Sequence, residues 1–181
     1  MKKVEPIRDL EKIKEVKNIL LKRCYRDYML FVIGINTGLR IGDILNLKIK
    51  DIKDKTYITL KEQKTRKDKK FKINQDLKEE LDKYIKNMEE YEFLFKSRKG
   101  TNQPISRVQA HRILKSSAKK AGLENISNHS MRKTFGYFYY KKYIEISYLQ
   151  KIFNHSLHSV TIDYIGINQD VIDKTIDNFY L

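Results

Sequence analysis

The stretch "TYITLKEQKTRKDKKFKIN", residues 56–74, decides the fold because the helical spacing of apolar residues stops there. Its β-branched and aromatic residues flank a tip made almost entirely of Lys, Arg, Asp and Thr. These flanking residues are Tyr57, Ile58, Leu60, Phe71 and Ile73. Short runs of this type around a polar turn are typical of antiparallel strands. The stretch therefore predicts two or three short strands with a basic loop at their tip.

The apolar spacing outside this stretch is helical. A helix is expected in "TGLRIGDILNL", through Leu39, Ile44, Leu45 and Leu47, and another from Leu77 to Ile85. Ser106 is a good N-cap and Gly122 a good C-terminal stop, so they bound a further helix. The remaining predicted helices cover about 8–22, 25–37, 128–142, 145–154, 157–164 and 169–179. With no repeat and no linker, the 181 residues form one mainly helical domain interrupted by a small sheet.

The chain is strongly basic. It has 38 Lys and Arg against 23 Asp and Glu, a net charge of +15 and a pI near 9.7. A field of this size attracts polyanions, so a nucleic-acid partner is favoured over simple solubility as the reason for the charge. A membrane-surface helix is less favoured, because the basic residues are spread along the whole chain.

Several other classes of protein are disfavoured. Cys24 is the only cysteine, which excludes an internal disulfide and a cysteine-rich zinc site. His155 and His158 are three residues apart, but too few ligands surround them, so we expect no metal and no cofactor. No stretch has the apolar length of a signal peptide or a membrane span, which predicts a cytoplasmic protein.

A histidine and an arginine begin the stretch "NHSMRKTFGYFYY", residues 128–140. On a helix that starts near Ser127, His129 and Arg132 share one face. Such a pair alone is most often a surface pair. The helix is therefore either a buried helix that carries charge or part of an active site in which one of the following tyrosines is a nucleophile.

A second arginine stands at a helix start. In "NTGLRIGDILNLKIKDI", residues 36–52, Arg40 follows a Thr-Gly break and precedes the helix. A cation gains least at this end of a helix, whereas an anion is favoured there, which argues for an anionic ligand. Asp43, one turn later, is placed to hold the guanidinium.

Two further segments contribute candidates. The strand tip "KEQKTRKDKK", residues 61–70, is either a solvated loop or a source of lysines for a DNA groove or a phosphate. In "IFNHSLHSVTIDYIGI", residues 152–167, His155 precedes Tyr164 with small polar residues between them.

These four segments, in this order, resemble the catalytic domain of tyrosine recombinases, the phage integrase family. "TGLRIGDILNL" is similar to the family's first-arginine box, "QKT" to its hairpin lysine, "HSMRKTF" to its His-x-x-Arg box and "NHSLHSVTIDY" to its His and nucleophilic Tyr. The resemblance implies an α+β, mainly α fold with a helical core and a small three-stranded antiparallel sheet. It also implies the catalytic set Arg40, Lys64, His129, Arg132, His155 and Tyr164.

The resemblance assigns a role to each member of this set. Arg40 and Arg132 would clamp the scissile phosphate, whose charge grows during attack. Tyr164 would attack with its phenolate, and His129 would accept the proton. Lys64 would protonate the leaving 5′ oxygen, with Lys67 as the alternative acid, and His155 would donate a hydrogen bond to the phosphate. The product would be a 3′-phosphotyrosine. The partner would be double-stranded DNA, and the residues expected to contact it are Lys67, Lys69, Lys70, Arg107 and Lys133.

Two positions depart from the family pattern. Lys133 stands where a second histidine is common, and Asn154 stands where glycine usually precedes the histidine. Asn154 preserves the turn if it adopts the left-handed conformation, which asparagine tolerates. The tyrosines 137, 139, 140 and 143 are interpreted as packing or phosphate-contacting residues.

The resemblance also suggests an assembly and alternatives. We expect residues 1–181 to be the catalytic domain alone, without an N-terminal core-binding domain, and the helix 169–179 to dock on a neighbour in a DNA-bound tetramer. The Lys-, Ile- and Asn-rich composition suggests a mobile element from an A·T-rich bacterial source. A type IB topoisomerase and a non-catalytic DNA-binding regulator of the same fold remain alternatives.

Overall fold

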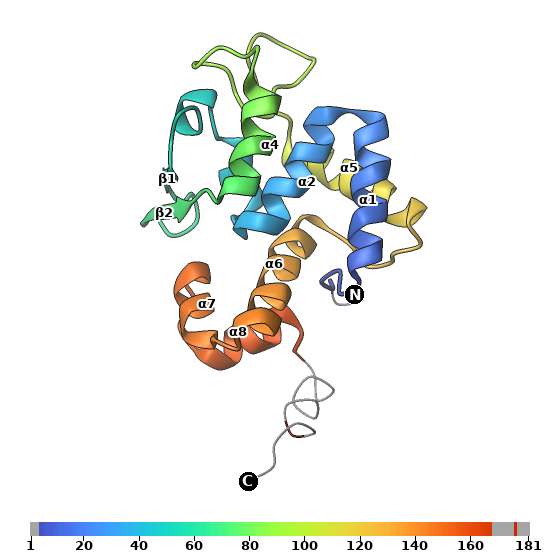
Figure 1. The fold of residues 1–181 in the computed structure, drawn as a ribbon, viewed down its shortest axis with the longest axis vertical. Helices are drawn as coiled ribbons and strands as arrows, with labels where there is room; N and C mark the ends of the chain where they lie inside the picture. The colour runs from blue at the N-terminus through green and yellow to red at the C-terminus, as the bar shows by residue number, and fades with distance from the viewer. Residues whose placement is uncertain (1–3, 168–175, 177–181) are drawn as a thin grey trace.

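The computed structural model describes residues 4–167 and 176, and its small hairpin lies at one edge of the helices (Figure 1). The first half contains α1 (Leu10–Arg23), α2 (Tyr25–Thr37), α3 (Ile41–Leu45), the 3₁₀ turn η1 (Ile49–Asp51), β1 (Tyr57–Lys61) and β2 (Asp68–Lys72). The second half contains α4 (Gln75–Ile85), α5 (Arg107–Lys120), α6 (Asn128–Tyr143), α7 (Ile146–Phe153) and α8 (His158–Ile165).

Helix α2 lies at the centre of the larger part of the fold. It packs on α1, α4 and α6 (Figure 1). Its apolar residues are buried on nearly every side. The main core extends from these helices to Ile58 of β1 and Leu114 of α5. A helix with so wide an apolar face is stable only inside such a shell.

A second, smaller core lies beneath the first, where α7 and α8 pack on the later turns of α6 (Figure 1). Leu149, Phe153 and Ile165 form its buried centre. Helix α6 contributes Met131 to the main core and Phe135 to the smaller one. It therefore fixes the position of the two parts relative to each other.

The predicted helices are confirmed to within a residue or two, and their caps explain the boundaries. Ser106 accepts a hydrogen bond from the backbone N–H of Gln109, and Ser127 and Ser130 form a capping box at the start of α6. These side chains satisfy N–H groups that have no partner inside the helix. The predicted helix at 169–179 lies outside the described residues.

The expected three-stranded sheet is wrong for the part of the chain that is described: β1 and β2 form a two-stranded antiparallel sheet. Their register pairs Tyr57 with Lys72 and Lys61 with Asp68. The segment before β1 turns into η1 and makes only an isolated bridge, between Lys48 and Phe93, so it does not extend the sheet. None of the described helices has the length and apolar character needed to span a membrane.

Candidate active site

Arg40 is presented by a sharp turn between α2 and α3. Gly38 ends α2 with φ 59°, and a Cβ atom there would lie 2.4 Å from the Phe135 ring, so both conformation and space require glycine. Arg40 is the N-cap of α3. Its Nη1 forms an ion pair with Glu62 Oε1 at 2.6 Å, and its Nη2 donates to the Phe153 carbonyl oxygen at 3.4 Å.

Arg132 reaches the same place from the first turns of α6. Its side chain is almost buried, and it donates from Nη1 to the Gly38 carbonyl at 2.6 Å and from Nη2 to the Phe153 carbonyl at 2.9 Å. The guanidinium also lies over the Phe153 ring, 4.2 Å from its centroid. Burial lowers the pKa of Arg132 to about 10, and the charge of Arg40 adds to this, so the group stays cationic at neutral pH.

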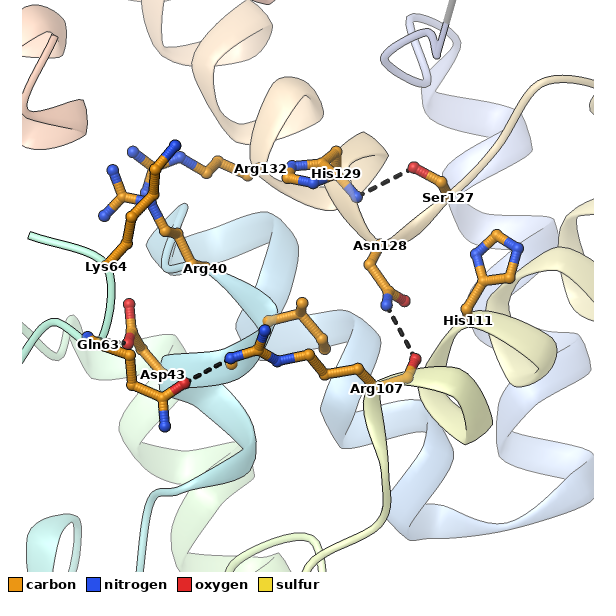
Figure 2. Close-up of a pocket in the computed structure, with 12 residues that line it drawn as sticks. Arg40, Asp43, Gln63, Lys64, Arg107, His111, Ser127, Asn128, His129 and Arg132 are labelled. Carbon is orange, nitrogen blue, oxygen red and sulfur yellow. Dashed lines mark hydrogen bonds between the residues drawn. The ribbon is translucent and has the colours of Figure 1, made fainter. Parts of the chain in front are cut away.

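Four of the six predicted catalytic residues line one open cavity of about 630 Å³. These are Arg40, Lys64, His129 and Arg132. Figure 2 shows Lys64 extending from the hairpin toward the two arginines, with His129 on the neighbouring turn of α6. These four residues thus bring three cations and an imidazole to the cavity from three separate segments, an arrangement that can bind a phosphate and move protons beside it.

The other two predicted residues lie against each other: His155 is in the turn after α7, and Tyr164 is on α8. Their ring centroids are 5.1 Å apart, and the Tyr164 ring also packs edge-on against Phe153 at 5.5 Å. Asn154 ends α7 with φ 53° and ψ 44°, which confirms that asparagine takes the left-handed turn here. Lys133 places its ammonium 5.1 Å from the Tyr164 ring centroid.

The surroundings of Tyr164 act on its proton in opposite directions. Burial raises the pKa of the phenol, whereas the charges of Arg132 and Arg40 lower it, and the net shift is upward. Both arginines therefore act electrostatically on this phenol. Burial alone would keep Tyr164 protonated, so attack requires a base together with these cations.

Both site histidines are neutral at neutral pH. Burial lowers the pKa of His129, and the charges of Arg132 and Lys133 lower it further. Burial and the two arginines lower the pKa of His155 to about 4. Nδ1 of His155 lies 3.1 Å from Thr161 Oγ1. The Thr161 hydroxyl also donates to the Leu157 carbonyl oxygen at 3.3 Å, and it has one proton to give. When the hydroxyl donates to Nδ1 in place of that carbonyl, the proton of the ring is on Nε2, where it can be donated to a ligand.

A buried carboxylate that the sequence reading missed lies behind the arginines. Glu62 is fully buried and binds Arg40, Lys69, Thr65 and Asn154. Burial raises its pKa, but the hydrogen bonds from Thr65 and Asn154 and the charges of Lys69 and Arg40 outweigh this and bring it to about 2. The sequence does contain a signal for this burial. Alternate residues of a strand face the same side, and Glu62, directly after β1, follows Ile58 and Leu60 on the inward-facing side.

The residues expected to contact DNA divide into exposed and buried groups. Lys67 and Lys70 are exposed on the hairpin, and Arg107 lines the cavity and donates to Gln63 Oε1 at 2.5 Å (Figure 2). Lys69 has a side chain only 9% exposed, held by Glu62 and by the Ile152 carbonyl. Lys133 is buried beside Tyr164. Burial lowers the pKa of Lys69 to about 8, and Arg132 contributes to this, so Lys69 belongs to the cation cluster.

In the part of the chain that is described, no three His, Cys, Asp or Glu residues come close enough together to hold a metal ion. The positive charge in the cavity comes from arginine and lysine side chains.

Comparisons with known proteins agree with this geometry. The model of the phage integrase family matches residues 9–170. A probable integrase/recombinase of Bacillus subtilis, YoeC, is 52% identical over 92% of this chain and 92% of its own length. The tyrosine recombinase XerA of Pyrococcus furiosus is 28% identical over 92% of this chain, which spans only 59% of that relative.

A solved structure shares the fold. The integrase of the transposon Tn1549, in complex with a circular intermediate DNA, has a TM-score of 0.76 at 20% identity, and the match covers 99% of this chain and 67% of the other. The family match covers most of the chain and includes the Arg40 turn, the Lys64 hairpin, the Arg132 helix and Tyr164. The chain belongs to the phage integrase family of tyrosine recombinases.

Proposed function

We propose that the chain is a site-specific DNA recombinase that cleaves and rejoins DNA strands through a covalent 3′-phosphotyrosine intermediate. One observation carries the proposal. Arg40 and Arg132, which are far apart in the sequence, meet on the Phe153 carbonyl at the edge of a cavity that also contains Lys64 and His129. The relatives named integrase or recombinase support the same reading.

The two guanidiniums provide the charge that the reaction needs. When a phenolate attacks a phosphodiester, negative charge builds up on the non-bridging oxygens. Arg40 and Arg132 have further N–H groups for those oxygens, and their positions are set before DNA arrives. Phosphoryl transfer of this kind depends mainly on positioning and charge stabilisation.

Three other side chains act as the general base, the general acid and a hydrogen-bond donor. His129, neutral at neutral pH, accepts the proton of Tyr164 as the phenol attacks phosphorus. The bond from phosphorus to the 5′ oxygen breaks, and Lys64 gives that oxygen a proton. His155 donates from Nε2 to a non-bridging oxygen. Rejoining reverses these steps: a 5′ hydroxyl attacks the phosphotyrosine, and Tyr164 leaves and recovers its proton.

DNA is the proposed partner because the chain has a net charge of +15, exposed Lys67 and Lys70 lie on the hairpin that carries Lys64, and exposed Arg107 lines the cavity. The transposon integrase of the same fold was solved on DNA. Assembly into a tetramer through residues 169–179 is part of the proposal and rests on the family resemblance. The type IB topoisomerase and the non-catalytic regulator are the competing functions.

Trapping on DNA tests the proposal. The protein is incubated with a library of nicked duplexes, in which the short strand released by cleavage diffuses away and leaves the adduct. We expect a protein–DNA band that resists denaturant and vanishes in Arg132→Ala, whereas a regulator would bind DNA without forming a band. Exchange of strands between paired cleaved duplexes then supports a recombinase, and relaxation of supercoiled DNA without exchange supports a topoisomerase.

A further inference from the structure

Glu62 accepts from four partners. Its Oε1 forms an ion pair with Arg40 Nη1 at 2.6 Å and accepts from Lys69 Nζ at 3.2 Å, and its Oε2 accepts from Thr65 Oγ1 at 2.6 Å and from Asn154 Nδ2 at 2.9 Å. A carboxylate has about four lone-pair sites, so this one has no capacity left for water or for DNA. Its function must therefore act through the groups it holds.

These groups come from segments that are far apart in the chain. Arg40 follows α2, Lys69 is on β2, and Asn154 is the residue between α7 and the predicted catalytic His155. Asn154 stands where the family usually has glycine. Glycine would adopt the same left-handed turn but could not donate to Glu62, so the asparagine adds a link from the turn to the carboxylate.

Glu62 approaches Arg40 from behind. Arg40, Lys64, His129 and Arg132 line the cavity, whereas Glu62, Lys69 and Asn154 are not among its lining residues (Figure 2). A phosphate in the cavity and Glu62 thus contact different sides of the arginine and do not compete for one place. Without Glu62, the side-chain hydrogen bond that Arg40 keeps within the described residues is the long one to the Phe153 carbonyl at 3.4 Å.

We propose that Glu62 is a positioning residue for strand cleavage, which holds Arg40, Lys69 and the turn before His155 in place as a pre-formed phosphate site. This inference rests on the proposed function and adds to it a buried acidic member. It remains charged throughout the physiological range, because its pKa lies near 2. Its negative charge also offsets the repulsion among the clustered cations Arg40, Lys69 and Arg132.

The test compares Glu62→Gln with Glu90→Gln. Both variants gain one unit of positive charge, but the Glu90 side chain is exposed and forms a surface ion pair with Lys53 at 3.4 Å, so Glu90→Gln controls for the stronger attraction of DNA. The glutamine at 62 turns an NH₂ group toward two donors and misaligns Arg40. We expect the cleavage rate of the bound complex to fall about 10²-fold, the cost of a misplaced catalytic group, while DNA affinity equals that of Glu90→Gln. Cleavage at the rate of Glu90→Gln would overturn the inference.

A duplex with sulfur in place of the 5′ bridging oxygen locates the defect. A thiol has a pKa of about 8.5 and leaves without an acid, so this substrate should restore cleavage by Lys64→Ala. Glu62→Gln should stay slow on it, because its defect lies in the phosphate clamp. If the sulfur substrate restored the cleavage rate of Glu62→Gln, the defect would lie in protonation of the leaving group and the inference would be overturned.

Asn154→Gly keeps the test decisive if Glu62→Gln fails to fold. The glycine retains the turn and removes only the donor to Oε2, so we expect a loss of roughly tenfold in cleavage rate, the size of one hydrogen bond. In the double variant the two losses should be less than additive. Full activity of Asn154→Gly, or simple additivity, counts against the link. No adduct from the native protein on any nicked duplex would instead overturn the proposed function itself.

Discussion

Arg40 and Arg132 donate to one main-chain atom, the carbonyl oxygen of Phe153, at 3.4 Å and 2.9 Å. Phe153 is the last residue of α7, where the carbonyls lack partners within the helix and carry its partial negative charge. The helix end therefore attracts both guanidiniums and sets the distance between them. A packing element of the small core thus also assembles the phosphate site.

Replacing Arg132 with lysine should abolish most of the cleavage. A lysine ammonium cannot reach the Gly38 carbonyl, the Phe153 carbonyl and a phosphate with a fixed planar fork, as Arg132 does. We expect the cleavage rate to fall about 10²- to 10³-fold, as when one preorganised donor is removed. Single-turnover cleavage of a nicked duplex measures this, with exposed Arg98→Lys as the control. Equal rates for the two variants would show that Arg132 has no special part.

The pH dependence of cleavage should report His129. Burial and nearby cations keep its folded pKa below the ordinary 6.5, and it acts as a base only when neutral. The rate should therefore be constant near neutral pH and fall as the pH drops through that lowered pKa. His155 has a pKa of about 4, so it stays neutral throughout the near-neutral range. In His129→Gln this acidic limb should disappear; an unchanged limb would assign it to another group.

Thr161 should control the proton of His155. Its hydroxyl lies 3.1 Å from Nδ1, and it is fully buried. Thr161→Val keeps the shape and removes the hydrogen bond, so Nε2 is no longer held as the donor and cleavage should slow roughly tenfold, the size of one hydrogen bond. Thr161→Ser retains the hydroxyl and should stay near the native rate. The account of His155 fails if valine and serine behave alike.

Gly136 should matter for both stability and activity. A Cβ atom at this position would lie 2.5 Å from Ile165 Cγ2 and 2.9 Å from two atoms of the Phe153 ring. Gly136→Ala should lower the free energy of unfolding by about 1–3 kcal/mol, because the core has no space for the methyl group. Urea unfolding measures this. A shift of Phe153 would also disturb both arginines, so native-like cleavage in Gly136→Ala would contradict the role given to Phe153.

Much of the fold followed from local signals. Apolar spacing and capping residues such as Ser106 and Ser127 act within a few residues, so helix positions could be predicted. The third strand could not, because strand pairing depends on distant segments: Lys48 meets Phe93 in one bridge without starting a strand.

The site divides in the same way. Arg40, Lys64, His129 and Arg132 were predicted from motifs in order along the chain, and the cavity brings them together. The role of Glu62 could not be predicted in this way, because it depends on contacts with Arg40 and Asn154, which lie far from it in sequence. Lys69 resembled its neighbours on a charged tip, and only the three-dimensional packing distinguishes it as buried.

The most direct measurement is to locate the attachment site of DNA on the protein. Trypsin is expected to release residues 152–174, in which Tyr164 is the only tyrosine, and residues 134–141, which contain Tyr137, Tyr139 and Tyr140. Mass spectrometry of the nuclease-trimmed adduct should find a 3′-linked nucleotide on 152–174, with no adduct from Tyr164→Phe. A nucleotide on 134–141, or an adduct that persists in Tyr164→Phe, would contradict the account.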